Sequence, residues 1–315
     1  MAAADRARGW GTVALLVLGC AATSAVQPAV LILVPLVVLL AAMPPVHPGR
    51  MGIGLGLGAW LFQSGGRESL WLIGWGWALL LAAWFLVATL ARPQARFLPR
   101  ALGALAGAVA SAALLLAAAP GAWPRVDWAV RTSLRGEATD AVLVMGTVLR
   151  DWPWAPEAME TAYRLAELRA MVYPALLALA SLAGLAVSWF AFQRIVRREP
   201  RPLAGLREFW FRDELVWLLV AGIALLVLPA GGAAQRAGWN LVAFMAGLYA
   251  LRGLGVLLSL AGMPGRAGIL LAAIVVPFLY PLVMAATVMV GLTDTWVDLR
   301  GRGPSGDSGS GATGS

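Results

Sequence analysis

Three polar residues that could bind a ligand, Asn240, Tyr249 and Arg252, lie inside one apolar run from Trp239 to Leu260. An arginine in the middle of an apolar segment costs roughly 2.5–3.5 kcal/mol on membrane-insertion scales. Arg252 therefore reaches the interface along its aliphatic stem, pairs with a carboxylate, or binds an anionic ligand. Asn240 begins the run, where capping of a helix is a sufficient role for it. We predict that the three residues line a polar ligand-binding site.

A second polar signature ends the last apolar run, with the sequence Gly-Leu-Thr-Asp-Thr-Trp-Val-Asp-Leu-Arg at 291–300. Asp294 and Asp298 are four residues apart and share one face of a helix, with Arg300 close by. A solvated ion pair at the end of a membrane span is the simplest interpretation of these charges. Together with Trp296 they form a C-terminal motif.

The residue types that most enzymes and metal sites need are scarce. The chain has one cysteine and one histidine, and its 24 basic residues are all arginine, so histidine-pair metal sites, thiol clusters and lysine chemistry are excluded. We find no serine elbow, no zinc-binding His-Glu motif and no paired intramembrane aspartates. We therefore expect no catalytic residues, no metal and no cofactor.

A glycine-rich run at 52–58 superficially resembles a dinucleotide fingerprint, but that motif needs a preceding strand. Within an apolar segment, glycines four residues apart favour close packing between helices. We predict this role for the pairs Gly52/Gly56 and Gly54/Gly58.

The composition indicates a polytopic membrane protein. Apolar residues make up 60% of the chain and charged residues 13%, whereas soluble domains carry about 25% charged residues. The net charge of +8 does not indicate nucleic-acid binding, because the arginines lie in loops between apolar runs rather than along one face. The expected partner of this surface is the lipid bilayer.

We expect an all-α transmembrane bundle of about nine spans, with eight as the alternative, and the short runs within 29–62 either span the membrane or form a re-entrant pair. Spanning takes about 20 apolar residues. A single membrane domain would cover 1–300, and the Gly/Ser-rich tail 301–315 would be disordered. The predicted spans are Trp10–Val26, Ala29–Met43, Met51–Phe62, Trp71–Leu90, Ala101–Ala119, Met171–Phe192, Leu215–Pro229, Trp239–Leu260 and Ala267–Leu292.

The segment 121–169 is an exception to this apolar pattern, since it is rich in charges and aromatic residues. We predict amphipathic helices at Ala138–Leu149 and Pro156–Met171. On the second helix, Glu160 and Arg164 have the four-residue spacing of an ion pair. We predict an extracytoplasmic insertion lying on the membrane surface. The aromatic and basic stretch 206–214 reads as an interfacial anchor.

Arginine distribution orients the chain. With nine spans and a cytoplasmic N-terminus, thirteen arginines fall in inner loops and two in short outer loops. The positive-inside rule then favours a bacterial inner-membrane protein with its N-terminus in the cytoplasm.

The C-terminal motif at 291–300 resembles the ending of the YybS-like family of uncharacterised bacterial membrane proteins. Trp239-Asn240, Leu248-Tyr249 and the early pattern of Pro35 and Arg50-Met-Gly52 are similar to that family as well. The family is thought to be distantly similar to the substrate-binding subunits of energy-coupling-factor transporters and to the MreD cell-shape protein. The resemblance implies a bundle that binds a small molecule or a partner helix.

Two functions follow as hypotheses. The first is a transporter-like, small-molecule-binding subunit that works with energising transporter subunits and uses Asn240, Tyr249 and Arg252. The second is a non-catalytic membrane scaffold for cell-envelope or morphogenesis proteins, with 121–169 or 194–214 as its contact surface.

Overall fold

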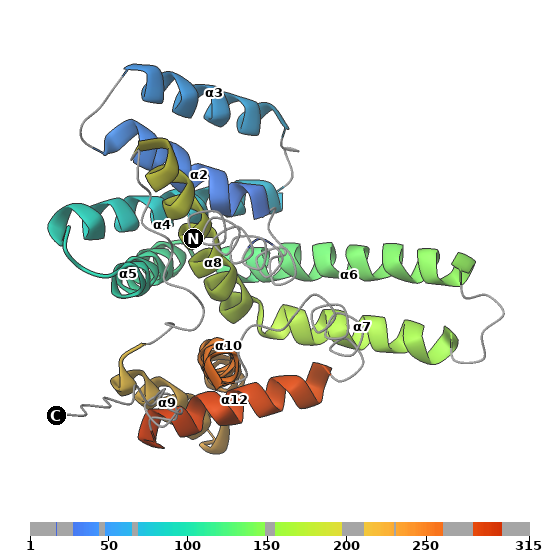
Figure 1. The fold of residues 1–315 in the computed structure, drawn as a ribbon. Coiled ribbons are helices and arrows are strands. Elements are labelled where there is room, and N and C mark those ends of the chain that lie inside the picture. Colours follow the sequence, from blue (N-terminus) through green and yellow to red (C-terminus); the bar gives the residue numbers. More distant parts are fainter. Residues whose placement is uncertain are drawn as a thin grey trace, which may run out of the picture. The chain divides into compact units, whose positions relative to one another are not determined.

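The computed structural model describes residue 17 and residues 28–43, 48–64, 69–148, 155–196, 211–229, 231–260 and 280–297. Within these ranges all regular structure is helical (Figure 1). The elements are α2 (Pro28–Ala42), α3 (Pro48–Ser64), α4 (Ser69–Ala91), α5 (Phe97–Ala118), α6 (Ala122–Val148), α7 (Ala155–Met171), α8 (Tyr173–Val196), η2 (Asp213–Leu215), α9 (Val216–Val227), α10 (Gly232–Leu260) and α12 (Tyr280–Val297).

The chain divides into two compact units. The first consists of Met1–Leu203 and Trp217–Phe244, and the second of Ala204–Val216 and Met245–Ser315. The helix α10 contributes its first part to the first unit and its remainder to the second.

Four of the described helices are long and apolar enough to cross a membrane, and each overlaps a span predicted from the sequence. They are Leu70–Ala91, Phe97–Ala118, Tyr173–Val196 and Gly232–Leu257. The shorter α2 is also strongly apolar and contains Pro35. The all-helical, multi-pass membrane architecture is therefore confirmed.

The nine-span count is not established by these helices. The predicted span Trp10–Val26 lies outside the described residues except for Val17, and so does the beginning of Ala267–Leu292. The described α9 has 12 residues, which is short of the roughly 20 that a full span takes.

The helices of the first unit approach one another closely at small residues and are joined by hydrogen bonds between helices. A Cβ atom added at Gly184 of α8 would lie 2.7 Å from the Leu31 carbonyl oxygen of α2, so glycine is what allows this approach. Ser188 donates to the Ile32 carbonyl oxygen, and Trp77 of α4 donates to Ser181 Oγ over 2.8 Å. Small residues and interhelical hydrogen bonds are the usual means of packing helices in lipid.

The glycine-rich run of α3 packs through only one of its two predicted pairs. Cβ atoms added at Gly54 and Gly58 would contact Val37 of α2 at ordinary van der Waals distances, 3.6 and 3.7 Å. No described atom lies within 4 Å of such an atom at Gly52 or Gly56. Among the described residues, the packing predicted for the Gly52/Gly56 pair is therefore not seen, and this face of α3 does not contact α2.

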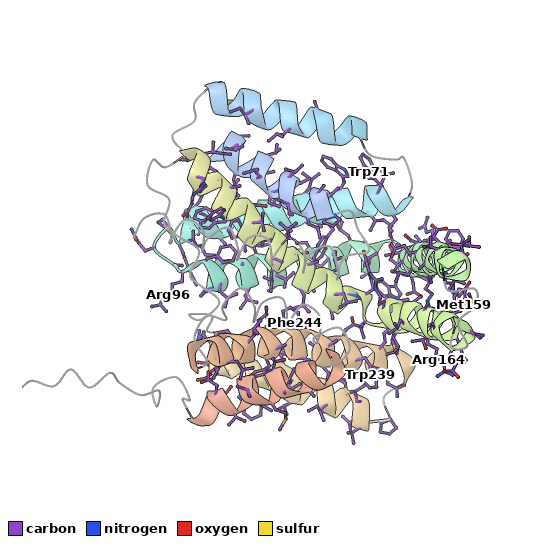
Figure 2. The ribbon with its side chains drawn as sticks, turned by 45° about the vertical axis from the view of Figure 1, so that its right-hand side comes forward. Trp71, Arg96, Met159, Arg164, Trp239 and Phe244 are labelled. Atoms are coloured by element: carbon purple, nitrogen blue, oxygen red, sulfur yellow. The ribbon has the colours of Figure 1, made fainter. Side chains whose placement is uncertain are left out.

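The segment 121–169 forms a helical hairpin in which α6 and α7 run antiparallel, side by side (Figure 1). Near its tip Met159 of α7 reaches Gly146 of α6 (Figure 2). The first amphipathic helix is longer than predicted, since it begins at Ala122 and not at Ala138. Its apolar stripe of Val126, Val130 and Leu134 has the four-residue spacing of one helix face and packs into the core of the first unit.

Ion pairs on the surface of this hairpin join its two helices. Arg135 Nη2 lies 2.6 Å from Glu167 Oε1, and Arg169 Nη1 lies 3.6 Å from Glu137 Oε2. The predicted pair between Glu160 and Arg164 is present and exposed. Exposed pairs of this kind contribute roughly 0–1 kcal/mol each, so the buried apolar stripe dominates the stability of the hairpin.

Candidate functional site

The second unit is organised by a close crossing of α10 and α12. A Cβ atom added at Gly253 would overlap the Thr287 carbonyl group, and one added at Gly291 would overlap the Tyr249 carbonyl group. The two backbones therefore touch at a pair of glycines, which only residues without side chains permit. This contact brings the side chains next to it on both helices, Tyr249, Arg252 and Asp294, into one cluster.

Arg252 is the centre of this cluster and is held by Asp294. Its Nε atom donates to Asp294 Oδ2 over 2.9 Å, and its Nη2 atom donates to the Asp294 backbone carbonyl over 3.1 Å. Both side chains are 3% exposed. Arg252 therefore does not extend to an interface, and of the three roles predicted for it the structure shows pairing with a carboxylate.

A second carboxylate reaches the same guanidinium from the short helix η2. Arg252 Nη1 donates to Asp213 Oδ1 over 2.9 Å, but the Asp213 side chain is 51% exposed. Among the described residues, the cluster thus contains one positive and two negative side chains when all three are ionised. Its two acidic partners differ in kind, because one is buried and bonded twice whereas the other is half-exposed and bonded once.

Aromatic rings cover this ionic group. The Phe211 ring is 2% exposed and packs edge-on against Tyr249, with 5.3 Å between ring centres. The same ring lies 5.3 Å from the Arg252 guanidinium carbon, in a cation–π contact. The fully buried Tyr249 places its hydroxyl near Thr295 without the geometry of a hydrogen bond. This hydroxyl is therefore one polar group of the cluster that has no hydrogen bond of good geometry to another described residue.

Asn240, the third residue of the predicted site, is engaged within the first unit. Pro174 lacks an N–H group, and the helical path breaks between α7 and α8 just before it. Asn240 inserts its amide there, accepting from Ala175 N–H over 2.9 Å and donating to the Met171 carbonyl over 3.0 Å. It acts as a cap for α8 from another helix.

This placement corrects the expected position of Asn240 in its own helix. The sequence interpretation put Asn240 at the beginning of a helix, but α10 begins at Gly232. The helix extends further because Ala233, Ala234 and Ala237 are good helix formers even though the segment is less apolar.

The C-terminal motif is only partly described by the structure. Asp294 lies in α12 and in the cluster above. Trp296 belongs to the same helix, and its side chain is outside the described part, as are Asp298 and Arg300. The expected pairing of Asp294 with Asp298 and Arg300 on one face thus falls outside the described residues.

A second ionic junction, which the sequence analysis did not identify, lies in the first unit. Arg236 of α10 pairs with Asp127 of α6 and donates to the Ala170 carbonyl over 3.1 Å. Arg131 also pairs with Asp127, at 3.0 Å. Pro174 is the reason that the Ala170 carbonyl is available, since this oxygen would otherwise accept from the missing N–H.

The pKa of Asp127 is shifted by this junction. Burial raises it, but the hydrogen bond and charge of Arg236, together with Arg131, outweigh burial and hold the pKa of the Asp127 carboxyl below its ordinary value. Asp127 is therefore charged at neutral pH and joins the hairpin to α10.

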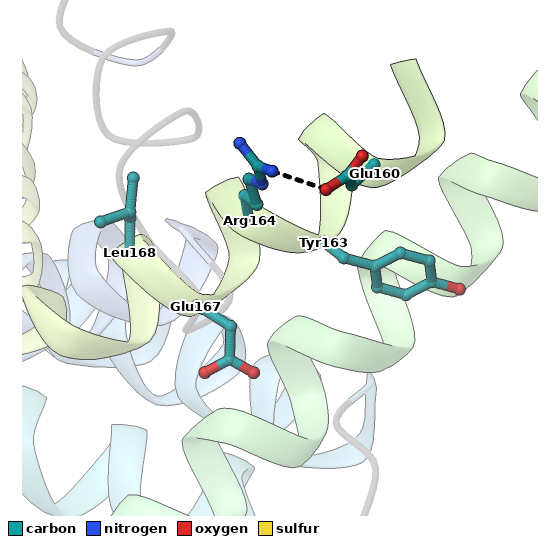
Figure 3. Close-up of a pocket in the computed structure, with 5 residues that line it drawn as sticks. All are labelled: Glu160, Tyr163, Arg164, Glu167 and Leu168. Atoms are coloured by element: carbon teal, nitrogen blue, oxygen red, sulfur yellow. Dashed lines mark hydrogen bonds and ion pairs between the residues drawn. The ribbon is translucent and has the colours of Figure 1, made fainter. Parts of the chain in front are cut away.

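The described residues also contain a shallow surface pocket of about 470 Å³ (Figure 3). It is lined by a single helix, α7, through Glu160, Tyr163, Arg164, Glu167 and Leu168. Its charged residues are already paired with one another or with Arg135. We therefore do not place the functional site there. No group of three or more metal-binding side chains occurs among the described residues.

Comparison with known proteins agrees with this architecture. Residues 155–295 match a family described as a predicted membrane protein (DUF2232). No curated protein and no solved structure matches the chain. The matched segment runs from α7 into α12 and so includes Asp213, Arg252 and Asp294. The family match and the apolar helices together identify a multi-pass integral membrane protein.

Proposed function

We propose that this protein is a non-enzymatic, transporter-like subunit of the bacterial inner membrane that binds a small molecule at the Arg252 cluster. Ionisable residues inside apolar helices are costly and commonly mark substrate pathways in membrane proteins. Here the buried guanidinium is bonded to one buried and one half-exposed carboxylate, beside a tyrosine hydroxyl that makes no hydrogen bond to another described residue. This combination is the observation on which the proposal rests.

Of the three ligand-binding residues predicted from the sequence, the proposed site contains Tyr249 and Arg252. It includes Asp213 and Asp294 in place of Asn240. The polar atoms of Asn240 are occupied by three backbone contacts, to Ala175, Met171 and Arg236, so a ligand would have to break them. The proposed orientation keeps the N-terminus in the cytoplasm, in line with the distribution of arginines in the sequence.

The test is purification of the tagged full-length protein from its own membranes in mild detergent, followed by mass spectrometry of the bound proteins. A transporter subunit is expected to bring down a transmembrane coupling protein together with ATPases. An Asp213→Ala variant should retain these partners, because it changes only the proposed ligand site. Recovery of envelope proteins without ATPases would contradict the transporter function.

A scaffold for envelope proteins is the second candidate, and the α6–α7 hairpin favours it. Trp128, Leu143 and Val144 of α6 and Leu168 of α7 are all more than half exposed, an unusual amount of large apolar surface for a hairpin rich in charges. Under this function Trp128→Ala should release the envelope partners in the same purification, whereas substitutions in the Arg252 cluster should retain them.

A further inference from the structure

We propose that the ligand of the Arg252 cluster carries a single carboxylate group, which takes the position now occupied by the Asp213 carboxylate. This inference rests on the proposed binding function and adds the chemical class of the ligand. It depends on the difference between the two carboxylates that hold Arg252.

Asp294 is the permanent partner of the arginine. It belongs to α12, is buried, and contacts the guanidinium through both its side chain and its backbone carbonyl. Its removal would take the buried carboxylate partner away from a buried charge, which proteins strongly resist. A ligand therefore does not replace Asp294.

Asp213 is the exchangeable partner. It belongs to the three-residue helix η2 and makes one described hydrogen bond to the guanidinium, through Nη1. Because its side chain is half-exposed, the carboxylate can turn to water without losing its hydration. A competing carboxylate that takes the same hydrogen bond restores the same charge to the arginine.

The surroundings of this position select the rest of the ligand. The buried Phe211 ring borders the guanidinium, so the surroundings of the Asp213 carboxylate are partly apolar. The Tyr249 hydroxyl belongs to the same cluster, is buried, and has no hydrogen bond of good geometry to another described residue, so it can donate to a second carboxylate oxygen. A monocarboxylate with an apolar body matches these groups.

Charge excludes a dianion from the same position. One carboxylate exchanged for another leaves the net charge of the cluster unchanged, whereas a phosphate dianion adds a negative charge close to the buried Asp294. Like charges in a poorly solvated site repel strongly. We therefore expect the cluster to distinguish a monocarboxylate from inorganic phosphate.

The experiment uses the full-length protein in phosphatidylcholine nanodiscs and measures thermal unfolding with benzoate as the probe. Asp213→Ala removes the competing side chain, so benzoate should stabilise this variant at a concentration on the order of tenfold lower than it needs for the wild type. Neutral benzamide should have no effect. Glu214→Ala is the matched control, because this neighbouring acid is exposed and pairs with Arg212.

Each other result has a definite meaning. Stabilisation of Asp213→Ala by phosphate and not by benzoate would overturn the carboxylate class but leave a binding site. The inference would be overturned if a probe shifted the unfolding temperatures of Asp213→Ala and Glu214→Ala equally, or if no probe shifted them at all. The proposed function would still be decided by whether transporter partners are recovered in the purification. A response to laurate in the bilayer but not to benzoate would support a carboxylate ligand and identify it as a lipid acid.

Discussion

Two arginines of the same helix, Arg236 and Arg252, are held in opposite ways. At Arg236 two arginines share one carboxylate, that of Asp127, and the backbone carbonyl of Ala170 completes the junction. At Arg252 two carboxylates share one arginine. The Arg236 junction has fewer carboxylates than arginines, so a ligand carboxylate has none to replace. The Arg252 cluster includes a half-exposed second carboxylate, which a ligand carboxylate can replace. The first therefore joins helices, and the second has the composition of a binding site.

The largest effect is expected from Asp294→Ala, which removes the buried carboxylate partner of the buried Arg252. Breaking a buried pair in this way costs about 3–5 kcal/mol, because an uncompensated charge remains. The double variant Arg252→Leu with Asp294→Leu removes both charges and should unfold at a higher temperature than Asp294→Ala. Thermal unfolding in detergent compares the two. If the double variant were less stable than Asp294→Ala, the buried charge of Arg252 would not be the cause of the low stability of Asp294→Ala.

Gly253→Ala should be the next most damaging change to the same cluster. The added methyl group would overlap the Thr287 carbonyl, and forced shifts of this kind cost about 1–3 kcal/mol. Gly103→Ala of α5 is the control, since no described atom lies within 4 Å of its added Cβ atom. Unfolding temperatures should fall for the first variant and not for the second. Equal values would contradict the close contact of α10 and α12.

The Arg236 junction should respond to acid. The pKa of Asp127 is depressed in the folded protein, so its contribution to stability is complete above the unfolded-state pKa, about 4, and is lost as the pH falls through the lower folded-state value. The unfolding temperature of wild type should therefore exceed that of Asp127→Asn at pH 7, and the difference should shrink below about pH 4. A difference that stays constant with pH would show that the carboxylate charge is not involved.

The smallest effect is expected from Glu160→Ala on the exposed face of α7. Its pair with Arg164 joins two solvated side chains four residues apart, a pair that contributes about 0.3–0.5 kcal/mol. The unfolding temperature should change little and should change less still at high salt. If Glu160→Ala lowered the unfolding temperature as much as Asp294→Ala does, the solvent exposure of an ion pair would not determine how much that pair stabilises the protein.

Periodicity and length were enough to predict much of the fold. The spans around α4, α5, α8 and α10 follow from runs of about 20 apolar residues, and the Glu160–Arg164 pair follows from its spacing within one helix. These features depend on residues that are close in sequence. The beginning of α6 was missed because its charged residues hide a regular apolar stripe.

The candidate site was predictable only in part. The cost of an arginine in an apolar run identified Arg252, and the C-terminal motif included Asp294, but nothing local to either residue predicts that they meet. Their contact depends on two glycines that let α10 and α12 touch. The role of Asn240 was missed for the same reason, since it depends on a helix break at Pro174, far away in sequence.

The carboxylates of Asp213 and Asp294, which pair with Arg252, are synthesised at different times. Asp213 precedes the arginine by 39 residues, and Asp294 follows it by 42. When the ribosome has completed α10, Asp213 is already available, and Asp294 has not yet been made. The arginine must enter the membrane with the weaker of its two partners, and it gains the permanent one only when α12 arrives. The helix α12 is thus a condition for the stable insertion of α10.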